Sequence, residues 1–128
     1  MKTLLIVGTA SLLMSCAGAV DSKDTAMSLA GSEWGTEITG QYIQFMSGGK
    51  ASGNGGCNQF GGPYRQSENG LKIGPLMSTE MACAGLAQES LFFAVLEDTR
   101  SADISHLTLA LKDADGITLL TLKRRDWD

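Results

Sequence analysis

The sequence predicts an α+β protein: a small, strongly curved antiparallel sheet or partly open barrel, with one main helix packed on it. Short segments of alternating apolar and polar residues recur along the chain, and glycine-rich turns separate them. A single stretch has helical spacing instead. A helix set apart from antiparallel strands is the arrangement of the α+β class.

The expected strands follow one another in the chain with turns between them. They are 32–38, 42–46, a strand starting at 50–53, 64–67, 71–76, 107–111 and 117–122. Gly40, Gly48 and the Asn69-Gly70 pair mark turns, and 113–116 turns the chain before the last strand. The third strand is expected to dissolve into a glycine-rich loop, where glycines allow bulges and the close approach of strands.

The helix is expected at 85–99. Phe92, Val95 and Leu96 form an apolar stripe along it, which we expect to pack on the sheet. Glu89 falls in the first turns, where a carboxylate interacts favourably with the helix dipole. We expect this structural role for Glu89 rather than acid–base chemistry, because no partner group is evident in the sequence.

The first residues have the plan of a secretory signal peptide. Lys2 precedes an apolar run that is too short to span a bilayer, and we assign 1–15 to the signal. Leu13-Met14-Ser15-Cys16 resembles a lipobox, which predicts a lipid anchor on Cys16. The alternative is a plain secreted protein with an accidental cysteine.

The lipobox interpretation divides the chain and predicts where it resides. Residues 16–27 would be a flexible, lipid-attached tether, followed by one domain over 28–128. Ala17 stands where an inner-membrane retention Asp could have stood, which in a Gram-negative cell favours the outer membrane, facing the periplasm. The membrane is then one partner, through the lipid on Cys16.

Charge and cysteine content restrict the remaining function classes. With 10 Lys and Arg against 14 Asp and Glu, the net charge is −4, and there is no basic stripe, so nucleic acid is not an expected partner. Cys57 and Cys83 remain as an even pair in an oxidising compartment, which favours a disulfide; two buried free thiols are the alternative. With His106 as the only histidine and no Cys-x-x-Cys spacing, no metal site is expected.

No catalytic residue or cofactor is predicted either. The glycine-rich stretch lacks the Lys-Ser/Thr ending of a phosphate-binding loop. A nucleophilic Cys57 would need an oriented base, and His106 before a leucine-rich strand is more typical of a surface residue. We therefore expect a protein that is not an enzyme.

The order of motifs along the chain resembles the META domain of the heat-shock protein HslJ family. The residues that carry this resemblance are Trp34, Gly53, Gly56, Cys57, Asn58, Phe60, Gly62, Tyr64, Thr79, Met81, Cys83 and Glu89. The resemblance implies that these positions are structural, in a small curved barrel whose helix covers one opening. It also implies a role in envelope stress, heat shock or antibiotic tolerance, and brings no defined catalytic chemistry with it.

Two functions follow as hypotheses. The first is a non-enzymatic cell-envelope lipoprotein that serves as an accessory or protein-binding factor in envelope stress or heat shock. The second is a carrier that holds a lipid or small apolar ligand inside the barrel. A cavity would favour the carrier, whereas a packed interior with an exposed apolar patch would favour the protein-binding factor.

Overall fold

The computed structural model describes residues 27–125, so the predicted signal peptide, Cys16 and the tether up to residue 26 lie outside the described residues. Its elements follow the chain in this order: β1 (Ser32–Gly35), β2 (Gln41–Met46), β3 (Lys50–Gly55), β4 (Gln59–Gln66), β5 (Leu71–Ile73), β6 (Met77–Ser78), α1 (Leu86–Asp98), β7 (Ser101–Ile104), β8 (Thr108–Lys112) and β9 (Thr118–Arg124). No described helix has the length and apolar character that crossing a membrane would require.

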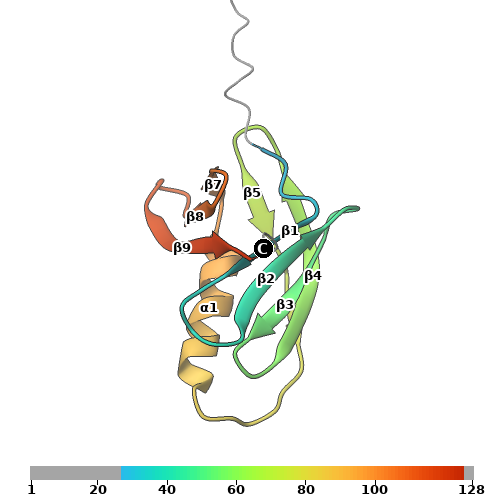
Figure 1. Cartoon of the computed structure of the whole chain (residues 1–128), viewed down its shortest axis with the longest axis vertical. Coiled ribbons are helices and arrows are strands. Elements are labelled where there is room, and N and C mark those ends of the chain that lie inside the picture. Colours follow the sequence, from blue (N-terminus) through green and yellow to red (C-terminus); the bar gives the residue numbers. More distant parts are fainter. Residues whose placement is uncertain (1–26, 126–128) are drawn as a thin grey trace, which may run out of the picture.

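The strands form one antiparallel sheet in the order β5-β4-β3-β2-β1-β9-β8-β7, and β6 pairs with β4 (Figure 1). Strand β1 lies in the middle, since Trp34 is paired with Ile43 of β2 on one side and with Arg124 of β9 on the other. The two ends of the sheet meet where the Leu71 N–H donates to the Arg100 carbonyl over 2.8 Å. The sheet is therefore a nearly closed barrel, and the predicted α+β class is confirmed.

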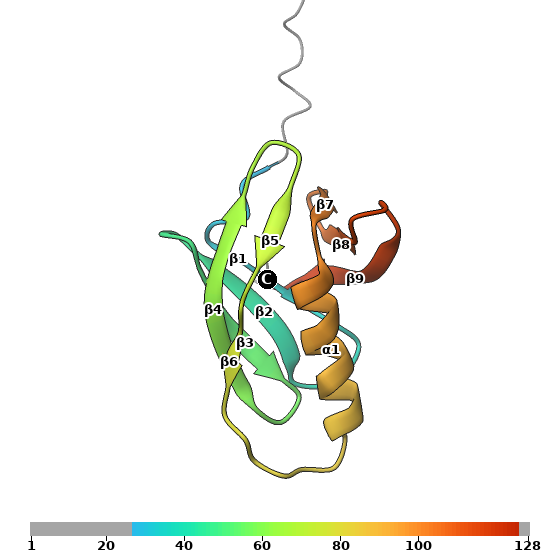
Figure 2. The same ribbon diagram turned by 180° about the vertical axis from the view of Figure 1, so that it is seen from behind.

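Helix α1 packs against β3, β5 and β8 on the inner side of this curve (Figure 2). Its inward face consists of Glu89, Phe92 and Leu96. Phe92 meets Phe60 of β4 edge to face, with ring centroids 6.0 Å apart, an arrangement that aromatic pairs favour. The side chains buried in the single core are Leu29, Trp34, Ile43, Phe45, Ala51, Phe60, Tyr64, Leu71, Ile73, Phe92, Leu96, Leu109, Leu111 and Leu122.

The expected glycine-rich loop is mostly strand. Strand β3 continues to Gly55 and β4 already starts at Gln59, so only 56–58 lie between them. Gly53 is paired with both Ile43 and Phe60, and a Cβ atom at Gly53 would collide with the Tyr42 carbonyl oxygen. Glycine here permits the close approach of three strands, which is why the segment stays in the ladder.

Other boundaries also differ from the prediction. The first strand ends at Gly35, the strand expected at 71–76 ends at Ile73, and β7 was not predicted at all. The Gly74 N–H still donates to the Pro63 carbonyl, and the chain turns away from β4 at Gly74, whose backbone has a φ of 107°. Leu109 and Leu111 are fully buried as their alternation predicts, while Leu107 is 49% exposed.

Candidate functional site

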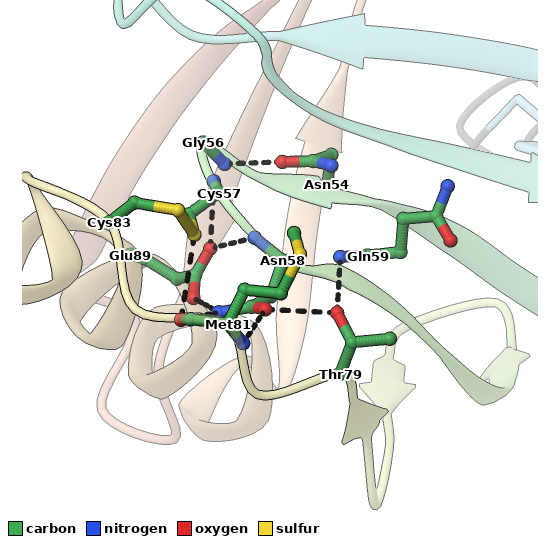
Figure 3. The surroundings of a disulfide bond; sticks show 9 residues. All are labelled: Asn54, Gly56, Cys57, Asn58, Gln59, Thr79, Met81, Cys83 and Glu89. Atoms are coloured by element: carbon green, nitrogen blue, oxygen red, sulfur yellow. Dashed lines mark hydrogen bonds between the residues drawn. A yellow bond between two sulfur atoms is a disulfide. The ribbon is translucent and has the colours of Figure 1, made fainter.

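A hydrogen-bonded group surrounds the short turn between β3 and β4, at one end of the barrel (Figure 3). We call it the Asn58 cluster, and it consists of Asn54, Gly56, Cys57, Asn58, Thr79, Met81, Cys83 and Glu89. It brings together three segments that are distant in the sequence: the β3–β4 turn, the segment after β6, and the start of α1. Most of the predicted motif residues outside the core belong to it.

The turn begins at Gly56, whose φ of 114° is a conformation that side chains with a Cβ rarely adopt. The Gly56 N–H donates to Asn54 Oδ1 over 2.7 Å, and the Gly55 N–H donates to the Asn58 carbonyl over 2.9 Å. These bonds close the turn tightly. As a result, the next two backbone N–H groups, those of Cys57 and Asn58, point to the same acceptor.

That acceptor is the carboxylate of Glu89, which enters from the first turn of α1. Its Oε1 accepts the N–H groups of Cys57 (3.0 Å) and Asn58 (2.7 Å), and its Oε2 accepts Asn58 Nδ2 (2.6 Å). Glu89 is only 4% exposed. A buried carboxylate is costly unless donors surround it, and hydrogen bonds to a charged acceptor are stronger than neutral ones.

The same contacts set the protonation of Glu89. Burial has the largest influence and by itself would raise the pKa of the carboxyl. The hydrogen bonds from the Asn58 backbone, the Asn58 side chain and the Cys57 backbone outweigh burial together and lower the pKa below its usual value. Glu89 is therefore a charged acceptor at neutral pH, not an acid with a proton to give.

Asn58 is the hub between Glu89 and the segment after β6. Its Oδ1 accepts the Thr79 hydroxyl (2.9 Å) and the Met81 N–H (2.5 Å), while its Nδ2 also donates to the Met81 carbonyl (3.2 Å). Thr79 Oγ1 in turn accepts the Gln59 N–H over 3.2 Å. Thr79 thus joins two segments.

The disulfide predicted between Cys57 and Cys83 is present. It spans 26 positions of sequence with a Cα–Cα distance of 6.0 Å. It links the β3–β4 turn to the same segment that Asn58 binds, so a covalent bond and a set of hydrogen bonds hold one loop in parallel. Two free buried thiols are excluded in this structure.

The remaining motif residues lie in or beside the core, away from the Asn58 cluster. Trp34 is 1% exposed and its Nε1 donates to Ser32 Oγ over 2.7 Å. The Tyr64 hydroxyl donates to the Met46 carbonyl over 2.9 Å, and a Cβ at Gly62 would lie 2.5 Å from the Pro75 carbonyl oxygen. The sequence motif therefore has two parts, one that packs the barrel and one that fastens its end.

The contacts of the Asn58 cluster attach the β3–β4 turn to the segment after β6 and to α1. Both sulfur atoms are in the disulfide, and His106 is an exposed residue of the β7–β8 connection, so Cys57 and His106 do not form a nucleophile–base pair. Within residues 27–125, no three His, Cys, Asp or Glu side chains gather in a way that could hold a metal ion.

Buried Gln41 of β2 supports the β3–β4 turn, because its Nε2 donates to the Gly55 carbonyl over 2.9 Å. This residue was not predicted from the sequence.

The comparisons with known proteins agree with this fold. The model of the META domain matches residues 25–126. No curated protein matches the chain significantly. An NMR structure of a protein from Burkholderia xenovorans has a TM-score of 0.63 at 19% identity, with 94% of this chain and 99% of that chain covered.

Two further solved structures are similar. A second NMR structure has a TM-score of 0.58 at 25% identity and covers 74% of this chain and 90% of that chain. A crystal structure of a DUF4847 family protein from Bacteroides vulgatus has a TM-score of 0.53 at 16% identity, with 70% of this chain and 62% of that chain covered. These likenesses concern the architecture.

Proposed function

Because the chain belongs to the META domain family, we propose that it is a non-enzymatic cell-envelope lipoprotein that acts by binding another envelope protein. Its role would lie in envelope stress or heat shock, as the resemblance to HslJ suggests. The lipid on Cys16 would hold it at the outer membrane, facing the periplasm. The domain would supply a stiff binding surface.

The packed interior favours this function over the carrier. Side chains from the sheet and from α1 fill the barrel, including the fully buried Trp34, Phe45 and Leu96. A hollow of about 620 Å³ is an open groove between the tip of the β4–β5 hairpin and β7. Polar and charged side chains such as Glu68, Asp103 and Lys112 line it, which is unlike the apolar pocket that a lipid chain requires.

The observation that carries the proposal is an exposed apolar surface on a fastened segment. Met77, Met81 and Leu86 are 79%, 56% and 38% exposed, and all three lie on the 77–86 segment held by Asn58 and the disulfide. Methionine is enriched at protein interfaces because its flexible side chain adapts to a partner. The disulfide and the Asn58 hydrogen bonds restrict the segment that carries these side chains, which would lower the entropic cost of ordering them on a partner.

The position of the tether supports the same function. The described chain begins beside the end of β4, where Gln66 Nε2 donates to the Met27 carbonyl over 2.7 Å. Figure 2 shows the segment between β6 and α1 at the opposite end of the barrel from the β4–β5 hairpin tip. An anchor at Cys16 would then leave the 77–86 segment pointing away from the membrane.

In-cell photo-crosslinking tests the binding surface. A photoreactive residue at Met77 or Met81 should yield a discrete adduct with one envelope protein. The same residue at Ile117, which is 59% exposed on the β8–β9 connection, is the matched control and should yield none. Equal adducts at all three positions, or adducts with lipid alone, would contradict the proposal.

The anchor and the absence of chemistry are tested separately. Labelling with a clickable palmitate should mark the wild type and not Cys16→Ser. Variants His106→Ala, Glu89→Gln and Cys57→Ser should each complement a stress-sensitive deletion strain to the extent that they remain folded. A fully folded single variant with no complementation would instead identify that residue as the place to look for chemistry.

A further inference from the structure

Two cations face each other on the outer side of the β4–β5 hairpin. Arg65 and Lys72 are direct cross-strand partners, and both are exposed. Like charges placed opposite each other destabilise a sheet. In the described part of the chain, neither side chain forms an ion pair or a hydrogen bond.

Arg100 adds a third cation from the end of α1. Its Nη1 donates to the carbonyls of Glu97 (2.8 Å) and Thr99 (2.7 Å), which fixes the guanidinium and leaves its other N–H groups for a ligand. Together with Arg65 and Lys72 it lines an open depression of about 380 Å³. Glu97 of α1 accepts the Leu76 N–H over 3.0 Å.

This basic face, defined by Arg65, Lys72 and Arg100, adjoins the point where the described chain begins. Gln66 lines the same depression, and its side chain holds both the Met27 carbonyl and the Leu29 N–H. Figure 1 shows the β4–β5 hairpin at the end of the molecule where the blue N-terminal segment starts. The three cations are therefore concentrated at the tethered end of a chain whose net charge is −4.

We propose that the Arg65–Lys72–Arg100 face binds the phosphate headgroups of anionic lipids in the membrane to which the protein is tethered. The proposal rests on the lipid anchor at Cys16. Cys16 and Met27 are 11 positions apart, so the tether spans about 36–40 Å at full extension. Docking would fix the domain against the bilayer and direct the 77–86 segment outward.

The affinity of the basic face for anionic lipid is expected to be modest in free solution. It is sufficient to dock a domain that is already tethered to the membrane. Each cation close to an anionic surface favours binding roughly fivefold at physiological salt. A short tether raises the effective concentration of the face at the membrane to about the millimolar range. Contacts that are weak in free solution therefore set the orientation once the anchor is in place.

The test uses the full protein purified from the envelope, placed in lipid nanodiscs that contain a spin-labelled headgroup lipid. With phosphatidylglycerol present, the amide signals of Arg65, Lys72 and Arg100 should broaden, and those around Cys83 should not. The double variant Arg65→Gln/Lys72→Gln should weaken docking about 25-fold and so reduce this broadening. The control Lys123→Gln/Arg125→Gln removes one lysine and one arginine from the β9 end and should leave the broadening unchanged.

The outcomes separate this proposal from the anchor. Broadening that is equal in phosphatidylcholine alone, or that survives Arg65→Gln/Lys72→Gln, overturns the basic face even when palmitate labelling shows a lipid on Cys16. If Cys16 carries no lipid, the anchor is wrong. The face still stands if the protein binds added phosphatidylglycerol nanodiscs and loses this binding in the double variant.

Discussion

Asn58 and Glu89 are joined by two hydrogen bonds, one from the Asn58 backbone (2.7 Å) and one from its side-chain amide (2.6 Å), although 31 positions separate them in the sequence. The pair connects the β3–β4 turn to α1. Since Asn58 also binds Thr79 and Met81, one amide and one carboxylate connect all three segments, alongside the disulfide.

Replacing Glu89 with glutamine should destabilise the domain by roughly 1–3 kcal/mol, because an amide NH₂ would face donors that now meet a carboxylate oxygen. Urea denaturation measures the change. The control Glu97→Gln lies on the same helix, is exposed, and can still accept the Leu76 N–H through its amide oxygen, so its stability should be close to that of the wild type. Equal losses in both variants would contradict the assigned role of Glu89.

The stability that Glu89 supplies should depend on pH. Its pKa in the folded state lies below the usual 4.5, so the carboxylate stabilises the fold fully above the unfolded-state pKa. That contribution is lost as the pH falls through the lower, folded-state pKa. The difference in unfolding free energy between wild type and Glu89→Gln should be largest near neutrality and shrink below about pH 5. A difference that stays constant down to pH 3 would show that charge is irrelevant at this position.

Removing the disulfide by Cys57→Ser/Cys83→Ser should cost about 3–4 kcal/mol of stability, the value expected for a closed loop of this length. Thermal or urea unfolding with and without reductant provides the measurement. Reductant should lower the wild type to the level of the double variant and leave the double variant unchanged. A wild type that is insensitive to reductant under unfolding conditions would refute this contribution.

Gly53→Ala should destabilise the barrel by about 1–3 kcal/mol, because the added Cβ collides with the Tyr42 carbonyl in the middle of the sheet. Gly61→Ala is the matched control on the neighbouring strand. Its Cβ would lie 3.4 Å from the Ala51 carbonyl oxygen, so the melting temperature should change little. Equal tolerance of both substitutions would mean that β3 can move away from β2.

Much of the sheet could be predicted because its core positions alternate. Leu71 and Ile73, and then Leu109 and Leu111, stand two apart, and all four are buried. Strand β7 was missed although Ala102 and Ile104 alternate with Ser101 and Asp103 and pack against the core. The strand has only four residues and none of them is fully buried, so its apolar signal is short and weak. Its place in the sheet comes from pairing with β8.

The disulfide could be predicted because two cysteines remained after Cys16 was assigned to the lipid. The role of Glu89 as the acceptor for the Cys57 and Asn58 N–H groups could not be predicted. The contacts between Glu89 and Asn58 are tertiary, and neither residue type indicates the other. One signal was present in the sequence: Glu89 stands three and seven positions before Phe92 and Leu96, on the buried face of the helix. A buried carboxylate needs hydrogen-bond donors around it, and the turn after β3 supplies them.

The central position of β1 determines when the barrel can be completed during synthesis. Ser32–Gly35 is the first strand of the described residues to emerge, yet one of its two neighbours is β9, which ends at Arg124. A chain that leaves a ribosome or a translocation pore from its N-terminus keeps an open edge on β1 until β9 has also been released. Premature termination anywhere before residue 118 would therefore expose this unpaired strand, and truncated products should be recognised by proteases and chaperones rather than accumulate as smaller folded domains.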